Sequence, residues 1–260
     1  MSQDPVLYEV VDRVSVISLN RPERHNALDD AAAAALWEAI DRGLAEPESR
    51  VLLLRGEGKS FCSGRDTTVL GKRLTGLSDF EHLTRSQQRK FRLLDSPKPV
   101  VAALRGHAVG GGFELALQAD IRIASTDTRM SLPEINYGIL TDGGGSSITA
   151  SLAGPSRAKY LLMSGEAIGA QQALDWGLVD FIASPEELDD AALGLARKLA
   201  AKPPVHLAAA KYLVEGVLGE RVRRGLRDEL MVQTGLFKTD DYQEARAARR
   251  ERRDPDYKGR

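Results

Sequence analysis

The sequence predicts an α/β fold whose central strands are buried and largely parallel. Short apolar runs alternate with helical patterns along the chain, as is typical of strand–helix–strand units. The runs are apolar at nearly every position instead of every second one, which indicates strands covered on both faces. The clearest of these runs are residues 14–20, 51–55, 100–104 and 121–124.

The first elements are predicted from β-branched runs and a helix cap. Residues 6–11 and 14–20 are rich in valine and isoleucine, and a two-residue break between them indicates a hairpin. Asp29 is suited to cap an alanine-rich helix that extends to about Ala45. With the strand at 51–55, these segments complete a strand–helix–strand unit.

Helical patterns dominate the second half of the chain. A composition shift near Pro203-Pro204 predicts a core over residues 1–201 and a helical C-terminal region over residues 202–260. A short β-run at 178–182 precedes that region. The expected later helices are 78–94, the stretch after the glycines at 110–112, 143–152, 156–164, 170–176, 185–201, 205–218, 220–236 and 240–252.

Composition excludes several classes of function. The chain has 36 Lys and Arg against 37 Asp and Glu, so neither nucleic acid nor a membrane surface is expected as its main partner. Its single cysteine, Cys62, suits a reducing compartment. No signal peptide is evident, and no run approaches the roughly 18 apolar residues of a membrane span, so a cytoplasmic protein is expected. The scattered histidines lack metal-ligand spacing, and no metal is expected.

The segment from Leu104 to Asp120 carries the strongest chemical signal. Three glycines, 110–112, precede a helical pattern in which Glu114 is the one acid among apolar residues. The first N–H groups of a helix lack internal partners and can face developing negative charge. Gly111 and Glu114 are three residues apart and therefore share a face. This spacing predicts an N–H donor beside an acid or base, which is a catalytic pairing.

This segment also allows two other interpretations. The glycines could form a flexible loop, with Glu114 as a solvated helix residue, and the segment alone leaves that alternative open. A nucleotide-binding loop fits less well, because Phe113 and Glu114 follow the glycines where a P-loop has Lys and Ser or Thr, and G-x-G-x-x-G is absent.

The order of several motifs resembles that of the crotonase superfamily, the enoyl-CoA hydratase/isomerase family, over nearly the whole chain. Each motif is weak when it is taken alone, but their order and spacing together are distinctive. The matching segments are Arg21-Pro22 with Asn26-Ala27-Leu28, the stretch FCSGRD from Phe61 to Asp66, GGGFELA from Gly110 to Ala116, Pro133-Glu134 with Gly138, and Glu251-Arg252-Arg253.

The resemblance implies a spiral of repeated ββα units with C-terminal helices that form a trimer or a dimer of trimers. It also implies that an acyl-CoA thioester oxygen lies between the backbone N–H groups of Arg65 and Gly111, each of which follows a glycine. Two aimed donors would stabilise the enolate that forms when carbons beside a thioester gain or lose a proton. Losing one such donor typically costs about 3 kcal/mol.

Hydratases of this family use two glutamates, and the resemblance places them at Glu114 and Glu134. Addition of water to a 2-enoyl thioester requires one carboxylate to take a proton from water and another to deliver a proton to the α-carbon. Two acids in one apolar pocket acquire different pKa values, so one can stay protonated while the other is ionised. The alternative for Glu134 is a capping box with Ser131.

Asp142 departs from the hydratase pattern, in which this position is commonly glycine. An acid eight residues after Glu134 is similar to dienoyl-CoA isomerases, although those commonly have Asp where this chain has Glu114. The alternative role for Asp142 is a cap for the helix that opens at 143–146. Both interpretations stay open at the level of sequence.

The resemblance further implies which residues contact coenzyme A, here as part of the substrate and with no separate cofactor. The leading hypothesis is a 2-enoyl-CoA hydratase, and the enzymatic alternative is a dienoyl-CoA or enoyl-CoA isomerase that uses Glu134 and Asp142. A non-catalytic acyl-CoA-binding protein is disfavoured because both glutamates and the glycine motif are present. The expected CoA contacts are Arg24, Asn26, Ala27, Leu28, Ser63, Arg65, Asp66 and Arg252.

Overall fold

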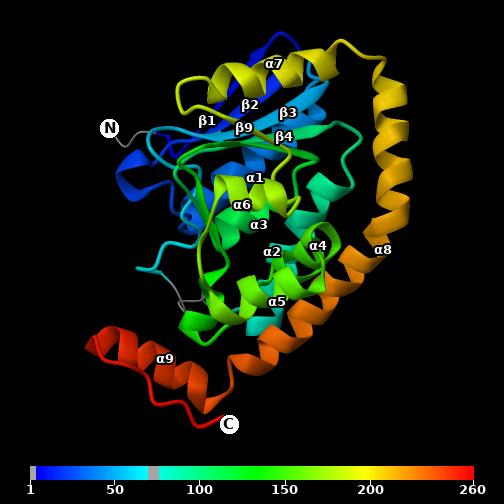
Figure 1. Ribbon diagram of the computed structural model, residues 1–260. Helices are drawn as coiled ribbons and strands as arrows, with labels where there is room; N and C mark the ends of the chain where they lie inside the picture. The colour runs from blue at the N-terminus through cyan, green and yellow to red at the C-terminus, as the bar shows by residue number, and fades with distance from the viewer. Residues whose placement is uncertain (1–3, 70–75) are drawn as a thin grey trace.

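A computed structural model describes residues 4–69 and 76–260 and shows a mixed α/β fold built on a six-stranded sheet (Figure 1). The strand order is β1-β2-β3-β4-β6-β9. β1 pairs with β2 in the antiparallel sense, and every later pair in this sheet is parallel. The strands are β1 (Val6–Val11), β2 (Val14–Leu19), β3 (Val51–Gly56), β4 (Val100–Leu104), β6 (Ile121–Ser125) and β9 (Phe181–Ala183).

The predicted N-terminal hairpin is confirmed. Val11 lies opposite Val14, and the connecting residues Asp12 and Arg13 have φ angles of 50° and 67°. Positive φ at both loop residues is the geometry of a type I′ turn, which matches the twist of the flanking strands.

Helices cover both faces of the large sheet, as the apolar strand pattern predicts. On one face, α7 (Leu188–Ala200) packs Leu188, Ala192, Ala196 and Ala200 against β2, β3, β4 and β6. The opposite face packs against α1 (Asp30–Ala45) and α3 (Gly111–Leu117), which Figure 1 shows beneath the sheet. Asp29 caps α1 by accepting a hydrogen bond from the Ala32 N–H at 2.8 Å, as predicted.

A smaller three-stranded sheet, in the order β5-β7-β8, carries the chain toward α3. Its strands are β5 (His107–Val109), β7 (Arg129–Ser131) and β8 (Ile168–Gly169). β5 ends directly before the glycines that open α3. The remaining elements of this half are α2 (Asp79–Leu94), the 3₁₀ helices η1 (Pro22–Arg24) and η2 (Pro133–Tyr137), α4 (Gly145–Ala153), α5 (Pro155–Ser164) and α6 (Ala170–Asp175).

The C-terminal region differs from its prediction in one respect. α8 (Pro204–Leu236) is a single helix of 33 residues, whereas the sequence predicted two helices that end and begin around Gly219. A glycine inside a helix costs only about 1 kcal/mol relative to alanine, and the packing of α8 on α2 and α4 outweighs that cost. α9 (Asp240–Glu251) follows and extends from the lower end of α8 (Figure 1). Among the described residues, no helix is long and apolar enough to cross a membrane.

The short β-run predicted at 178–182 is displaced. Leu178 and Val179 are buried, but the chain pairs as strand β9 only from Phe181 to Ala183. The two buried residues form the turn after α6, where both N–H groups donate to the carbonyl of Ala173. The apolar run at 178–182 therefore predicted buried residues correctly, but it did not predict which residues pair as a strand.

Candidate active site

Two glycine-containing segments meet where the sequence predicted a pair of N–H donors. A Cβ atom on Gly64 would lie 2.5 Å from the Val109 carbonyl oxygen and 3.4 Å from the Gly111 nitrogen, so only glycine allows this approach. Gly112 is confined in the same way, because its Cβ would lie 2.3 Å from the Cys62 carbonyl oxygen. The turn that ends at Gly64 therefore lies against the first turn of α3.

Backbone pairing fixes the Gly64 segment in place. Cys62 donates to the His107 carbonyl at 2.9 Å and accepts from the Val109 N–H at 3.0 Å. On the other side, Leu28 donates to the Gly64 carbonyl at 2.8 Å. Within residues 4–69 and 76–260, no hydrogen bond uses the N–H of Arg65 or of Gly111 as its donor. Both groups remain available to an added acceptor.

Glu114 is buried, with 2 % of its surface exposed, so the interpretation of a solvated helix residue is wrong. Its Oε1 accepts hydrogen bonds from the Gly143 N–H at 2.6 Å and the Gly145 N–H at 3.1 Å. Burial raises the pKa of Glu114 to about 7, the Lys90 ammonium acts in the opposite sense, and the carboxylate of Asp142 adds to the rise. The side chain can therefore exist in either protonation state near neutral pH.

Lys90 of α2 supplies a buried positive charge that the sequence did not suggest. Its Nζ donates to Asp142 Oδ1 at 2.7 Å. A Cβ on Gly143 would lie 2.7 Å from both Lys90 Nζ and Glu114 Oε2, so a larger residue there would displace the ends of both side chains. Burial opposes the charge on Lys90, but the carboxylates of Asp142 and Glu114 outweigh it and raise its pKa.

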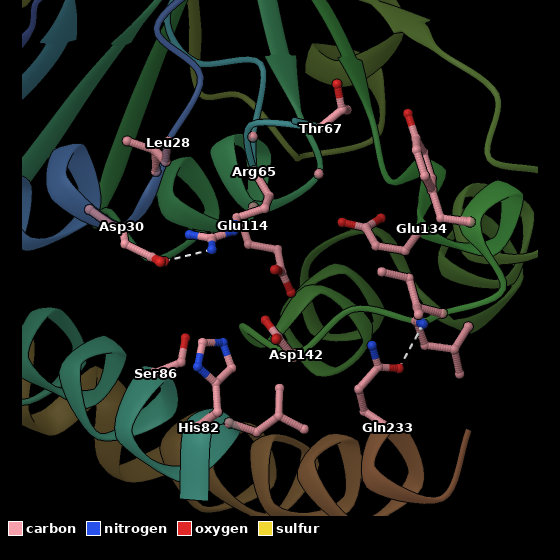
Figure 2. A pocket seen from close by; sticks show the side chains of 18 of the residues that line it. Leu28, Asp30, Arg65, Thr67, His82, Ser86, Glu114, Glu134, Asp142 and Gln233 are labelled. Atoms are coloured by element: carbon pink, nitrogen blue, oxygen red, sulfur yellow. Dashed lines mark hydrogen bonds and ion pairs between the residues drawn. The ribbon is translucent and has the colours of Figure 1, made fainter. Parts of the chain in front are cut away.

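Glu134 lies in η2 and points toward the same space as Glu114 (Figure 2). A Cβ on Gly110 would lie 2.9 Å from its Oε1, and its buried Oε2 has no hydrogen-bond partner among the described residues. Burial, followed by the charge of Glu114, raises the pKa of Glu134 well above its usual range. The alternative interpretation of Glu134, a capping box with Ser131, is wrong, because η2 has Leu132 at its N-cap and no side-chain cap.

The predicted cap role of Asp142 is also wrong. Gly144 is the N-cap residue of α4, and Asp142 is held by Lys90. The cap is supplied by Glu229 of α8, which accepts from the N–H groups of Gly144 and Ser146, each at 2.8 Å. A carboxylate so distant in the chain satisfies these N–H groups, and a local sequence pattern cannot show it.

These residues surround a cavity of about 1300 Å³ between α1, α2, α3, η2 and α9. A family model described as enoyl-CoA hydratase/isomerase matches residues 9–260. The chain belongs to this family. It is 35% identical to (E)-benzylidenesuccinyl-CoA hydratase of Thauera aromatica, over 98% of this chain and 99% of that protein. It is 34% identical to 2,3-dehydroadipyl-CoA hydratase of Escherichia coli, over 95% of this chain and 96% of that protein.

Solved structures of the family have the same fold. An enoyl-CoA hydratase/isomerase from Pseudoalteromonas atlantica superposes with a TM-score of 0.88 at 26% identity, covering 98% of this chain and all of that one (100%). The crotonase-like fold expected from the sequence is therefore confirmed.

Some of the predicted catalytic and CoA-binding residues line this cavity, and others do not. Leu28, Ser63, Arg65, Gly111, Glu114, Glu134 and Asp142 line it. Figure 2 labels Leu28, Arg65 and the three acids. Arg24, Asn26, Ala27, Asp66 and Arg252 lie outside its wall. Asn26 is a structural residue here, because its Oδ1 accepts from the Arg21 N–H at 2.8 Å and its Nδ2 donates to the Ser60 carbonyl at 2.7 Å.

Several wall residues were missed at the level of sequence. α2 contributes a polar face, and α9 contributes Arg246, Arg249 and Arg250 instead of Arg252. The guanidinium of Arg249 stacks over the Tyr137 ring, 4.4 Å from its centroid. The one signal in the sequence was the run of arginines near the end of the chain. It indicates that this segment is basic, but it does not show which of its arginines face the cavity. Among the described residues, no group of His, Cys, Asp and Glu is arranged to hold a metal ion.

Proposed function

We propose that this protein is a 2-enoyl-CoA hydratase that adds water across the α,β double bond of an acyl-CoA thioester. One observation carries the proposal. Glu114 and Glu134 face a single cavity beside the N–H groups of Arg65 and Gly111, which donate no hydrogen bond within the described residues. Two carboxyl groups beside two donors are the set that the reaction needs. Membership of the hydratase/isomerase family supports it.

The proposed reaction begins with the thioester oxygen between the N–H groups of Arg65 and Gly111. Enolate charge then accumulates on that oxygen, and donors already in place stabilise it without reorganisation. Burial and the charge of Glu114 raise the pKa of Glu134 and favour its protonated form, which delivers a proton to the α-carbon. Glu114, with a pKa of about 7, takes a proton from the water that attacks the β-carbon.

The test is a comparison of two substrates. We expect purified protein to consume crotonyl-CoA, measured as the loss of the enoyl thioester absorbance, with formation of 3-hydroxybutyryl-CoA confirmed by mass spectrometry. A 3,5-dienoyl-CoA should react more slowly or not at all. Conversion of the dienoyl-CoA to its 2,4-isomer without hydration of crotonyl-CoA would reverse the assignment.

Isomerisation is the second candidate, and the position of Asp142 on the cavity wall favours it. A proton relay along a conjugated chain would need this carboxylate as a second acid or base. We expect Asp142→Asn to retain crotonyl-CoA hydration within tenfold, because Asn keeps an acceptor for Lys90. If Asp142 shuttles protons, dienoyl isomerisation in the same variant should fall by roughly a hundredfold. Both rates are measured on one preparation.

We also propose that the region 202–260 assembles the protein into a homotrimer or a dimer of trimers. α8 exposes several large apolar side chains, and such a surface is typical of an interface. They include Val205, Tyr212, Leu213, Val214 and Val217. Light scattering should give the mass of three or six chains, and Val217→Glu should lower it. A monomeric full chain would contradict the proposal.

Truncation after Ala201 would be a less informative test of assembly than a surface substitution. α8 supplies Glu229 to the start of α4 and Gln233, whose Oε1 accepts from the Leu140 N–H at 2.9 Å. Removing α8 would therefore disturb the site as well as any interface, whereas Val217 is 75% exposed and lies outside the cavity wall.

A further inference from the structure

The cavity face of α2 is polar and basic where an acyl chain would lie. Its residues have the spacing i, i+3, i+4, i+7 and i+8, which places them on one side of a helix. Figure 2 shows His82 and Ser86 directed from α2 toward the space in front of Glu114 and Asp142. The cavity-lining residues of this face are His82, Arg85, Ser86, Arg89 and Lys90, and the adjoining Leu83 is the one apolar residue that α2 adds to the wall.

Two of these cations form no close ion pair, although the charge of Arg85 acts on the carboxylate of Glu81, one turn earlier on α2. Lys90 is neutralised by Asp142 at 2.7 Å, and on the opposite wall Arg65 is neutralised by Asp30 at 2.6 Å. By contrast, neither Arg85 nor Arg89 forms an ion pair with any carboxylate in the described part of the chain. The basic side of α2 thus carries positive charge that an anionic ligand could neutralise.

The position of this face relative to the reacting groups fits the remote end of an acyl chain. Lys90 adjoins Glu114 around Gly143, so the C-terminal end of the face lies beside the proposed reaction centre. The face extends from there back to His82, about 12 Å along the helix at 1.5 Å per residue. An apolar chain there would desolvate Ser86 and the basic groups without compensation, which is unfavourable.

Granting the proposed hydratase function, we propose that the substrate's acyl chain ends in a carboxylate that Arg85 and Arg89 bind, with His82 and Ser86 lining its path. Hydrogen bonds between guanidinium and carboxylate groups are charge-assisted and can be bidentate. A chain with a cationic end would meet like charge on this face, and a purely aliphatic chain would offer neither guanidinium a partner.

The experiment compares two acyl-CoA pairs that differ only at the end of the chain. The reactive pair is trans-2-hexenoyl-CoA and the CoA monothioester of trans-2-hexenedioic acid. The saturated pair, hexanoyl-CoA and the monothioester of hexanedioic acid, measures binding by calorimetry without any reaction. Wild type should prefer the carboxylated member in kcat/KM and in Kd. In Arg85→Gln/Arg89→Gln, both preference ratios should fall by about tenfold.

Arg92→Gln is the matched control. Arg92 is a third arginine of α2 that lies outside the cavity wall and pairs with Asp41 on the surface, so this variant should keep the wild-type ratios. If kcat/KM and affinity in Arg85→Gln/Arg89→Gln fell equally for both members of a pair, the inference would be overturned. Such a result would mean that the arginines contact CoA itself. Equal binding of both members by wild type would also overturn it. Preferential binding of the carboxylated compound without hydration would instead refute the proposed function and leave this inference standing.

Discussion

Replacing Glu134 by glutamine should lower kcat for crotonyl-CoA by at least roughly a hundredfold while the protein stays folded. The side chain keeps its volume but loses the acidic proton that the proposed mechanism delivers to the α-carbon. Glu134 Oε2 has no hydrogen-bond partner among the described residues, so the substitution breaks no contact of that atom. The measurement is steady-state kinetics together with a thermal unfolding curve.

A suitable control is Glu166→Gln, which removes an exposed carboxylate near η2 that does not line the cavity. That variant should match wild type in both rate and melting temperature. Near-normal turnover by Glu134→Gln would mean that another group donates the proton and would remove Glu134 from the mechanism. A large fall in KM alongside kcat would instead indicate ground-state strain in the wild-type complex.

The sequence predicted those features of the site that depend on short stretches of chain. Gly64 and Gly112 mark where two backbones approach closely, and such a constraint is visible in the residue type itself. The spacing of Gly111 and Glu114 on one helical turn is equally local. The hairpin, the cap at Asp29 and the strand cores were predicted for the same reason.

Features that depend on contacts between distant segments could not be predicted. Lys90 had the pattern of an ordinary charged helix residue, and only the packing of α2 against the 142–145 loop shows that it meets Asp142. Glu229 caps α4 from more than eighty residues away. Ser131 and Asp142 matched local cap patterns, but Leu132 and Gly144 occupy those cap positions and the competing tertiary contacts decided the outcome.

Replacing Lys90 by methionine should move the acidic limb of the kcat/KM profile to higher pH by about one unit. The Lys90 ammonium lowers the pKa of Glu114 against the effect of burial, so its removal lets that pKa rise above about 7. Glu114 must be ionised to accept a proton from water, and a higher pKa reduces the ionised fraction at neutral pH. One unit corresponds to about 1.4 kcal/mol, or about tenfold in rate at pH values below the limb.

The charges around Glu114 make a double variant the decisive control. Lys90 of α2 lowers its pKa, whereas the carboxylates of Asp142 in the adjoining loop and Glu229 of α8 raise it. Lys90→Met alone also breaks the Lys90–Asp142 ion pair, so stability should fall by a few kcal/mol. Lys90→Met/Asp142→Asn removes one charge of each sign, and both the pH limb and the melting temperature should return toward wild type. An unchanged limb in Lys90→Met would show that Glu114 is not the base whose ionisation limits the rate.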